Sequence, residues 1–525
     1  MIKIINIIIF IILFMACRDN NGDLMVHSDQ KTNRNWTTFV AALSAAVMTL
    51  DITVVNVALP SIGQGLQTDL AHLQWVINGY TLSFAAFLLL SGSLSDRLGR
   101  RRIFLIGMVV FTVSSLACAL SVHANILIIA RIIQGIGGAM VFGTAPALIA
   151  GACEGEAPGV RTFSMGVFAA GSAFSAAVGP LIGGVLIQFA SWSWLFAINV
   201  PFGVLIIIFT LKKVTEYSPD ASLYPLDLLG AILITVALFC LNYSVITFPS
   251  VGFKDTTVYI TFIVGCIASV LFILNEWNRG DSALLNLKLF RIPAFIGAIL
   301  LSFSGRIFSF GLMPFIIFWL SGLLGYSPLQ IGAIFFVQSI IMVIAAIFSG
   351  ISGKRIQSRV LLAGGMLVVA SGLFICSNIQ PDSDWISILP LMILVGIGTG
   401  MIMPHLMDLA VSVVPVRQAG MASGTANTFF PLGTSTGVAI FGLLLTQYLS
   451  YELPPEVLRL QGIVDPELLI QSLARGQVSM LNGHSVLLAQ ARQAWSEALN
   501  LLFIIAGAAS VLAAAGSLWL LRSVK

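Results

Sequence analysis

Charged side chains are scarce in this sequence. Only 9% of its 525 residues are Asp, Glu, Lys or Arg, while 58% are hydrophobic; soluble domains carry about 25% charged residues. So little charge cannot cover a water-exposed surface, which excludes an ordinary soluble enzyme. The net charge of +4 gives no reason to expect a nucleic-acid partner, because in a membrane chain the placement of Lys and Arg matters more than their sum.

Patterns that carry catalysis or bind metals are also missing. The six cysteines are scattered, with no CxxC or His-paired spacing, so we expect neither a structural disulfide nor a metal site. The sequence contains no HExxH, the local signature of zinc-dependent proteases. We therefore expect no catalytic residue and no cofactor.

Long apolar runs are abundant instead. Runs of about 20 residues, enough for a helix to cross about 30 Å of hydrocarbon, recur from Trp36 to Leu521 with short polar breaks. They do not alternate as barrel strands do, so the predicted fold class is all-α, a polytopic membrane protein. The fourteen predicted spans are 37–58, 72–94, 103–121, 125–150, 161–187, 192–211, 226–247, 256–275, 293–320, 329–350, 359–377, 386–411, 420–447 and 498–521.

The positions of Lys and Arg predict how these spans are oriented. When the segment before residue 37 is cytoplasmic, most of the 26 Lys and Arg residues fall in cytoplasmic loops, as the positive-inside rule requires. Both termini are then cytoplasmic, in a bacterial inner membrane. The one long outer loop, 448–497, is expected to form short amphipathic helices.

The first residues resemble a bacterial lipoprotein signal. One Lys precedes an apolar run from Ile4 to Met15, and Ala16-Cys17 follow. The run is too short to span a membrane, and cleavage there would place the mature N-terminus outside, against the predicted orientation. We therefore treat 1–36 as an N-terminal segment, with 1–17 signal-like, and expect the functional chain to start near Met25 because of an upstream start codon.

Parts of the sequence repeat at a constant offset of 258 residues. The segment Gly92–Gly107 aligns with Gly350–Gly365, and the same offset relates three further pairs of glycines, Gly166 to Gly424, Gly179 to Gly437 and Gly184 to Gly442. Two halves of six spans each, with two spans inserted between them, account for the fourteen. We expect bundles at 37–211 and 293–525, with inserted helices and linkers at 212–292. Such repeats indicate alternating access to a midplane site.

Asp51 lies inside the first predicted span, in the string Leu50-Asp-Ile-Thr-Val-Val-Asn-Val-Ala-Leu-Pro60. Because an ionised carboxylate at membrane depth costs several kcal/mol, we interpret Asp51 as a group that binds a proton or a cationic substrate. Asn56 of the same string is assigned to this site. The alternative is an acid near the outer end of the span that solvent or an arginine satisfies.

Arg131 and Gln134 lie in the fourth predicted span, within Arg131-Ile-Ile-Gln-Gly-Ile-Gly-Gly138. Residues three apart share a helix face, so we expect both side chains to line a cavity opposite Asp51. The alternative is that Arg131 only extends to the outer membrane interface.

The turn between the second and third spans is interpreted as a gate. Basic residues there follow from the topology alone, so Asp96 is the informative one: an acid among cations can hold a helix end in one conformation and release it in another. The second copy has Lys354 in its place, which predicts a one-sided gate. The gating residues are Gly92, Asp96, Arg97, Gly99, Arg100 and Arg101.

A glycine–proline pattern in the fifth span predicts a pliable hinge. Proline removes a helical hydrogen bond, and glycines admit close neighbours; a purely structural kink is the alternative. The hinge residues are Gly171, Gly179, Pro180, Gly183 and Gly184.

Further polar residues lie at depth in the second half. Arg306, His405 and Asp408 are candidates there. A second-half charge pair, such as Arg306 with Asp408, is one interpretation, and nothing in the sequence shows that these residues meet. Asp227, after Pro225, is expected to cap a helix. Five aromatic residues are candidates for a wall that receives lipophilic cations, with ordinary packing as the alternative: Trp75, Tyr80, Phe84, Phe142 and Trp319.

Five strings occur in one order: Asp51–Pro60, Asp96–Arg101, Arg131–Gly138, Gly179–Gly184 and Trp194–Pro201. In this order the sequence resembles, over about 37 to 521, the fourteen-span drug:proton antiporter family of the major facilitator superfamily. The resemblance implies multidrug efflux driven by the proton gradient. It also implies that Asp51 is the membrane acid, Arg131 the fourth-span arginine, Asp96 the gating acid and Gly179-Pro180 the antiporter hinge.

The sequence thus predicts a proton-driven antiporter that exports lipophilic or cationic drugs or toxic compounds by alternating access. One alternative is a narrow exporter of one metabolite, siderophore or antibiotic. Another is a non-transporting membrane sensor or scaffold, for which only the loop 448–497 has room for a partner-binding domain. The expected partners are a small-molecule substrate, protons and the lipid bilayer; the sequence contains no signal for or against a periplasmic adaptor.

Overall fold

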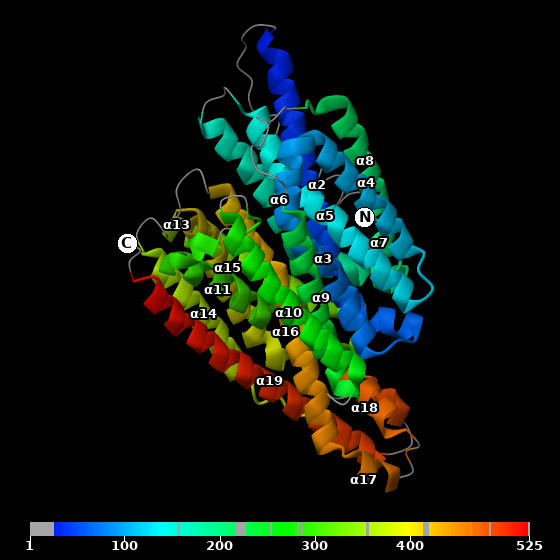
Figure 1. Cartoon of the computed structure of the whole chain (residues 1–525). Helices are drawn as coiled ribbons and strands as arrows, with labels where there is room; N and C mark the ends of the chain where they lie inside the picture. Colours follow the sequence, from blue (N-terminus) through cyan, green and yellow to red (C-terminus); the bar gives the residue numbers. More distant parts are fainter. Residues whose placement is uncertain are drawn as a thin grey trace.

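The computed structural model is helical, with no strand among the residues that it describes. These are 26–154, 158–216, 227–251, 255–280, 283–285, 287–352, 356–412, 419–460, 463, 465–481 and 485–522. The signal-like residues 1–17 and the predicted start near Met25 lie outside these ranges. Figure 1 shows the early helices (blue to cyan) and the late helices (yellow to red) as two groups.

The first bundle contains the first six predicted spans. Asp69 caps its second helix, because its side chain accepts a hydrogen bond from the backbone N–H of His72 at 2.8 Å. The sixth span is divided into a short helix and a longer one. The elements are α2 (Val26–Leu66), α3 (Leu70–Leu98), α4 (Arg100–Ala119), α5 (Ala124–Ala152), α6 (Pro158–Phe189), α7 (Trp194–Ala197) and α8 (Asn199–Lys213).

The second bundle contains the last six predicted spans and two short helices between the last two. Its membrane-length elements are α11 (Pro293–Phe310) continued by α12 (Met313–Phe318) and η3 (Trp319–Leu323), then α13 (Pro328–Ser352), α14 (Ser358–Ile375), α15 (Leu389–Ser412), α16 (Ala419–Glu452) and α19 (Ser485–Leu520). The short elements are η2 (Leu287–Arg291), η4 (Trp385–Ile388), α17 (Pro455–Leu460), α18 (Pro466–Ala474) and η6 (Val478–Leu481).

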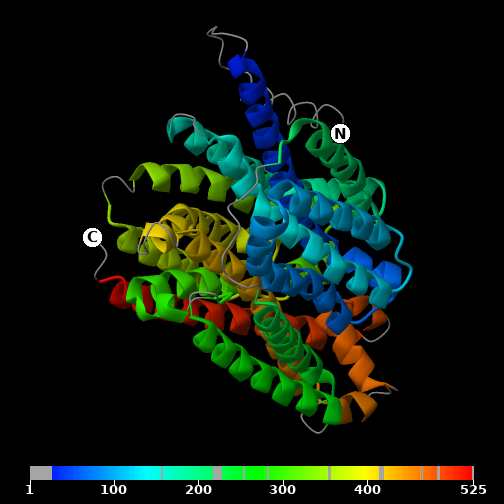
Figure 2. The ribbon, with the colours of Figure 1, turned by 45° about the horizontal axis from the view of Figure 1, so that its top comes forward.

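Two inserted helices, α9 (Leu228–Val251) and α10 (Thr256–Arg279), pack against each other, and α9 also contacts α3 and α16. Figure 2 shows them side by side along one edge of the molecule, in green. Trp75 of α3 stacks on Phe239 with ring centroids 5.9 Å apart. Ser435 of α16 donates a hydrogen bond to Asn242 at 3.2 Å. The inserted pair therefore touches both bundles through α9.

Asp227 caps α9, as the sequence predicts: the backbone N–H of Gly230 donates to its carboxylate at 2.8 Å. The same carboxylate joins α10 through Asn275 at 2.9 Å and Arg279 at 3.2 Å. Burial acts to raise the pKa of Asp227, but hydrogen bonds with Glu276, Gly230 and Asn275 and the charge of Arg279 lower it overall. This cluster ties the two inserted helices together at one end.

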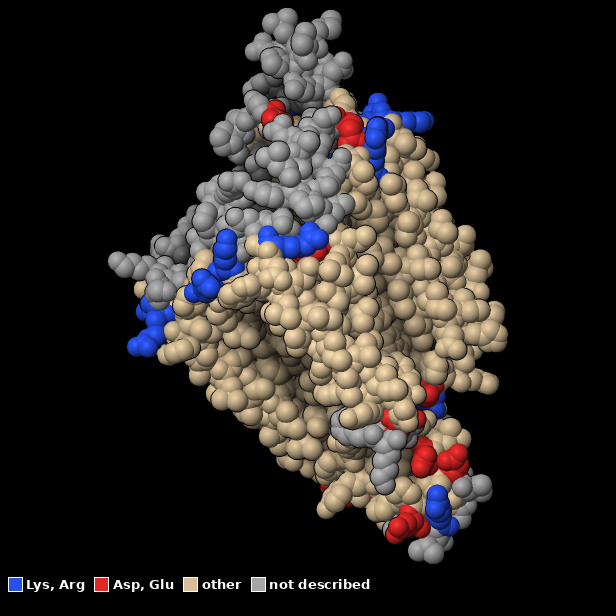
Figure 3. Space-filling model, viewed as in Figure 1, with Lys and Arg blue, Asp and Glu red and all other residues tan. Residues whose placement is uncertain are grey.

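The lengths and apolar surfaces of the helices confirm a polytopic membrane protein. Thirteen described helical segments are long and apolar enough to cross a membrane, and α3, with 29 residues, covers the remaining predicted span, 72–94. In Figure 3 a broad belt of the visible surface is nearly free of charged side chains. The all-helical, polytopic fold is therefore as predicted.

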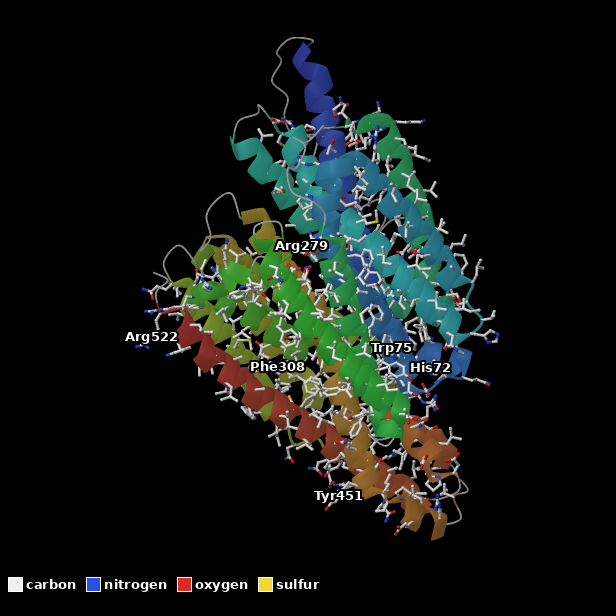
Figure 4. The ribbon with its side chains drawn as sticks, in the orientation of Figure 1. His72, Trp75, Arg279, Phe308, Tyr451 and Arg522 are labelled. Carbon is white, nitrogen blue, oxygen red and sulfur yellow. The ribbon has the colours of Figure 1, made fainter. Side chains whose placement is uncertain are left out.

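The two ends of the molecule beyond this belt differ. We call one the α18 end, since it carries α17 and α18, and the other the basic end, since Arg101, Lys212 and Lys213 lie there at helix ends. Figure 4 places His72 and Tyr451 toward the α18 end and Arg279 and Arg522 toward the basic end.

Two predicted spans differ from the structure. The span 293–320 is interrupted after Phe310, where Gly311 approaches α16 so closely that a Cβ on it would lie 2.7 Å from the Cα of Gly437, and Pro314 then starts a new helix. The last span begins at Ser485 and not at 498. As a result α16 and α19 take up much of the predicted loop 448–497, and the short helices expected there are α17 and α18.

Contacts in the two halves recur at the repeat offset. Gln74 of α3 donates a hydrogen bond to the carbonyl of Val438 in α16 at 2.9 Å. The matching contact is made by Gly332 of α13, which is 258 residues after Gln74, and Pro180 of α6, which is 258 residues before Val438. Gly332 lies against the carbonyl of Pro180. The two bundles therefore meet through two related helix pairs, α3 with α16 and α6 with α13.

Candidate functional site

Asp51 is the centre of a buried polar cluster in the first bundle. It lies on α2, its side chain is 0% exposed, and its Oδ2 accepts a hydrogen bond from Nη1 of Arg131 at 2.5 Å. Its Oδ1 accepts from Nε2 of Gln134 at 3.0 Å and from Nδ2 of Asn199 at 2.7 Å. Three donors from α5 and α8 thus surround the carboxylate, so its immediate setting is polar and not apolar.

Arg131 is held on every side. Its side chain is 2% exposed, its Nε donates to the carbonyl of Val76 at 3.1 Å, and its Nη1 also donates to Oε1 of Gln134 at 2.7 Å. The Tyr80 ring lies under the guanidinium, 4.2 Å from centroid to Cζ. The alternative in which Arg131 extends to the membrane interface is therefore wrong. The arginine and Asp51 form a direct ion pair and do not face each other across a cavity.

Asn199 is the member of the cluster that sequence reasoning missed. It is the first residue of α8 and fully buried, and it lies in the Trp194–Pro201 string that carries part of the family resemblance. The available signal was an asparagine inside an apolar span. Ser115 of α4 is a second such residue, since it accepts a hydrogen bond from Gln134 at 2.8 Å.

Asn56, which the sequence assigned to this site, does not join the cluster. It is buried on α2, and its Nδ2 donates to the carbonyl of Ile52 one turn earlier, at 3.4 Å. Its described hydrogen bond is therefore within its own helix and not with Asp51, Arg131 or Gln134. Its assignment to a proton or substrate site stays a prediction.

The cluster lies nearer the α18 end than the basic end. Helix α5 starts at the α18 end with Ala124, so Arg131 is about 10 Å along its axis at about 1.5 Å per residue. Val76 and Asn199 also lie close to the helix starts at that end. The pair is thus close to the place where the two bundles meet.

The predicted gating turn connects α3 to α4 at the basic end. Gly99 has φ +101°, a conformation that favours glycine, and a Cβ there would lie 2.9 Å from Oε1 of Glu216. Arg100 donates to the carbonyl of Ala147 at 3.2 Å. Arg101 donates to the carbonyl of Leu211 at 2.7 Å, in the last turn of α8, where cations are favoured.

The rest of the gate prediction remains untested. Among the described residues, a Cβ on Gly92 would have no neighbour within 4 Å, so their packing does not explain that glycine. The side chains of Asp96 and Arg97 lie outside the described part of the turn. The gating role of Asp96 therefore stays a prediction.

The predicted hinge residues lie on two faces of α6, which runs as one 32-residue helix through Pro180. Gly171, Gly179 and Gly183 face α2: a Cβ on Gly171 would lie 2.7 Å from the carbonyl oxygen of Ala42, and Gly179 lies against Thr53. Gly184 faces the other bundle, where a Cβ would lie 2.5 Å from the carbonyl oxygen of Pro328. These glycines permit close packing; the pliability of the helix stays a prediction.

Among the described side chains of the second half, the candidates Arg306 and His405 have different partners. His405 bonds α13, with Nε2 3.0 Å from Oγ of Ser349. Arg306 of α11 lies between two phenylalanine rings. The side chain of Asp408 lies outside the described residues, so the predicted Arg306–Asp408 pair is not tested.

The five candidate wall aromatics do not share one surface. Trp75 packs on α9, and Trp319 is fully buried in η3. Tyr80, Phe84 and Phe142 do form a continuous row, with centroids 5.8 and 5.9 Å apart. Only this row remains a candidate apolar surface beside Arg131.

The segment after α18 lies between the bundles at the α18 end. Arg475 donates hydrogen bonds to the carbonyl of Thr68, in the α2–α3 loop, and to Oγ of Ser472 at 2.9 Å. A Cβ on Gly476 would lie 2.5 Å from the carbonyl oxygen of Phe318. A cavity of about 330 Å³ lies here, lined on one side by Pro60 and Leu73 and on the other by Phe318 and Arg475, among others. The described contacts therefore join the two halves at this end.

Comparison with known proteins gives the same fold and names relatives. The family model described as Major Facilitator Superfamily matches residues 41–438, and again 294–524. The chain is 32% identical over 414 residues to the tetracenomycin C resistance and export protein of Streptomyces glaucescens, covering 78% of this chain and 76% of that one. It is 31% identical over 409 residues to the methylenomycin A resistance protein of Bacillus subtilis (strain 168), covering 77% and 86%.

Two further similarities point the same way. The chain is 31% identical to the putative multidrug resistance protein MdtD of Escherichia coli O81 (strain ED1a), covering 80% of this chain and 88% of that one. A solved bacterial homologue of the human lysosomal transporter Spinster matches the fold with a TM-score of 0.62 at 15% identity, covering 93% and 97%. The chain is therefore a multi-pass membrane transport protein and not an enzyme, and it belongs to the Major Facilitator Superfamily, in the group of drug:proton antiporters.

Proposed function

We propose that this protein is a proton-driven antiporter that exports lipophilic drugs or toxic compounds, cationic ones included, from the cytoplasm. The observation that carries the proposal is the buried Asp51–Arg131 pair, a titratable carboxylate held at membrane depth by donors from other helices. Intramembrane ionisable groups are costly and mark ion pathways. The resistance and export functions named for the relatives support the direction of transport.

The contacts of Asp51 suggest how a proton changes the bundle. Protonation removes the negative charge that pairs with Arg131, and it weakens the hydrogen bonds that Gln134 and Asn199 donate. Because these donors belong to α5 and α8, the packing of α2 against both helices depends on the proton. Proton and substrate are coupled if each favours a different arrangement of these helices.

Alternating access requires the contacts at the α18 end to separate. We propose that the α18 end faces outward and the basic end faces the cytoplasm of a bacterial inner membrane, with both termini inside, as the positive-inside rule favours. Labelling of single cysteines by a membrane-impermeant maleimide in whole cells tests this: a cysteine at Tyr451 should react and one at Arg522 should not. The reverse pattern would refute the orientation.

Gly184→Val is expected to lower efflux about tenfold or more. A valine there would overlap the backbone of Pro328 and Leu329. Overpacking of this kind destabilises the conformation in which α6 and α13 touch by about 1–3 kcal/mol. The matched control is Gly166→Val on the same helix, where a Cβ has no neighbour within 4 Å in the part of the chain that the structure describes. Initial efflux rates at equal expression measure both; equal rates for the two variants would contradict the close contact as a functional joint.

The function itself is tested with and without the proton gradient. A pump-deficient bacterial host that expresses the chain should tolerate several lipophilic drugs, and an ionophore that collapses the proton gradient should abolish efflux of a fluorescent lipophilic cation from energised vesicles. Efflux that persists without the gradient would refute proton coupling. Protection against one compound alone would favour the narrow exporter. The relative from Streptomyces glaucescens is named for the export of one antibiotic, tetracenomycin C.

A further inference from the structure

Arg306 occupies the middle of an interrupted span. It lies on α11, one turn before the break at Gly311, whose backbone N–H donates to the carbonyls of Arg306 and Ile307. The whole span, Pro293–Leu323, has 31 residues, so Arg306 lies close to its midpoint. Substrate sites of transporters with repeated halves are typically formed near the midplane by such discontinuous helices.

Two aromatic rings hold the guanidinium of Arg306. Its Cζ lies 4.3 Å from the ring centroid of Phe310, one turn later on α11, and 4.9 Å from that of Phe430 on α16. On the α16 side, a Cβ on Gly433 would lie 3.0 Å from the Cβ of Arg306, so the two helices are in close contact here. The rings interact with the π system of the guanidinium and accept none of its in-plane N–H hydrogen bonds.

The hydrogen-bond donors of Arg306 are not used within the described part of the chain. A guanidinium has five N–H donors, and within these residues no carboxylate or carbonyl accepts from Arg306. Arg131, the other arginine at depth, instead pairs with Asp51 and donates to Val76 and Gln134. As a residue, Arg306 is partly exposed, whereas Arg131 is buried. Within its described residues, the second bundle thus presents a fixed cation with open donors at mid-span.

We propose that Arg306, flanked by Phe310 and Phe430, is the subsite that recognises an acidic oxygen group, such as a carboxylate, on a lipophilic substrate. The two oxygens of a carboxylate match the parallel N–H groups of a guanidinium, and the phenyl rings contact the apolar body beside it. This inference rests on the proposed export function for its role in transport. It adds a substrate class, lipophilic acids, to the compounds that Asp51 would attract.

The test is equilibrium binding of three probes that share one apolar body. The purified full-length protein in nanodiscs is titrated with 4-(1-pyrenyl)butyrate, with its uncharged methyl ester and with a pyrenylbutyl trimethylammonium salt. The wild type should prefer the carboxylate over the ester. Arg306→Met should weaken carboxylate binding about tenfold or more and leave the ester and the cation unchanged, and Arg306→Lys should restore part of the affinity.

The matched control is Arg291→Met, because Arg291 also lies over an aromatic ring, that of Trp277 at 5.8 Å, but on an exposed 3-10 turn. This variant should bind all three probes as the wild type does. The proposal is overturned if the wild type shows no preference for the carboxylate. An ion pair between Asp408 and Arg306 would give that result. It is also overturned if Arg306→Met keeps that preference or weakens all three probes equally.

Failure of the proposed function gives a different result. Binding needs no gradient, so the carboxylate preference and its loss in Arg306→Met would remain even if efflux proved independent of protons. Conversely, gradient-dependent efflux of a lipophilic cation that persists in Arg306→Met would support the proposed function whatever the carboxylate binding shows.

Discussion

Replacement of Asp51 by Asn is expected to abolish gradient-driven efflux. Asparagine has nearly the same shape and keeps an acceptor for Gln134 and Asn199, but it can neither carry the charge that pairs with Arg131 nor bind and release a proton. If proton and cargo exclude each other at this carboxylate, no residual coupling is expected. The measurement is the initial rate of substrate efflux from energised right-side-out vesicles at matched protein levels.

Two further variants make this result specific. Asp51→Glu keeps the titratable group and should retain part of the activity. Asp465→Asn serves as the control, because Asp465 caps α18 and asparagine is an equally good capping residue; its efflux should equal that of the wild type. Normal, gradient-dependent rates in Asp51→Asn would show that the proton is carried elsewhere.

The second large effect concerns stability. Arg131→Met leaves the carboxylate of Asp51 buried without its counter-charge, and loss of one partner of a buried ion pair costs about 3–5 kcal/mol. The expected result is a clearly lower unfolding temperature of the purified protein in detergent. Because Asp51 and Arg131 are both buried, solvent screening does little to reduce this effect.

The double variant Asp51→Asn with Arg131→Met separates stability from transport. It removes both charges and keeps an acceptor for Gln134 and Asn199, so its unfolding temperature should return toward that of the wild type, as expected when a whole buried pair is replaced. Its gradient-driven efflux should stay absent. Recovery of efflux in the double variant would mean that the pair is structural and not the coupling site.

Much of the fold followed from local properties of the chain. A helix that crosses the membrane satisfies its own backbone hydrogen bonds, so the length of each apolar run determines one span without reference to its neighbours. This explains why the predicted span 103–121 agrees closely with α4. It fails at 293–320, because the break at Gly311 arises from contact with Gly437 of α16, which local sequence does not specify.

The same distinction applies to the candidate site. The cost of a charge in the membrane is local, and it marked Asp51 and Arg131 without any structure. Their partners depend on the register between helices: Asn199 is 148 residues from Asp51 along the chain. A single-residue change in that register would rotate the asparagine away from the carboxylate, so only the packed structure could identify it.

The sequence by itself determined the fold class and the buried charges, because both follow from hydropathy, length and the cost of placing charge in lipid. Only the tertiary structure decided that Arg131 neutralises Asp51 directly, that Gly184 and Gly332 join the bundles, and that two phenylalanine rings hold Arg306. These depend on how helices distant in sequence pack, since a side chain's partners are set by helix rotation and register and not by its neighbours along the chain.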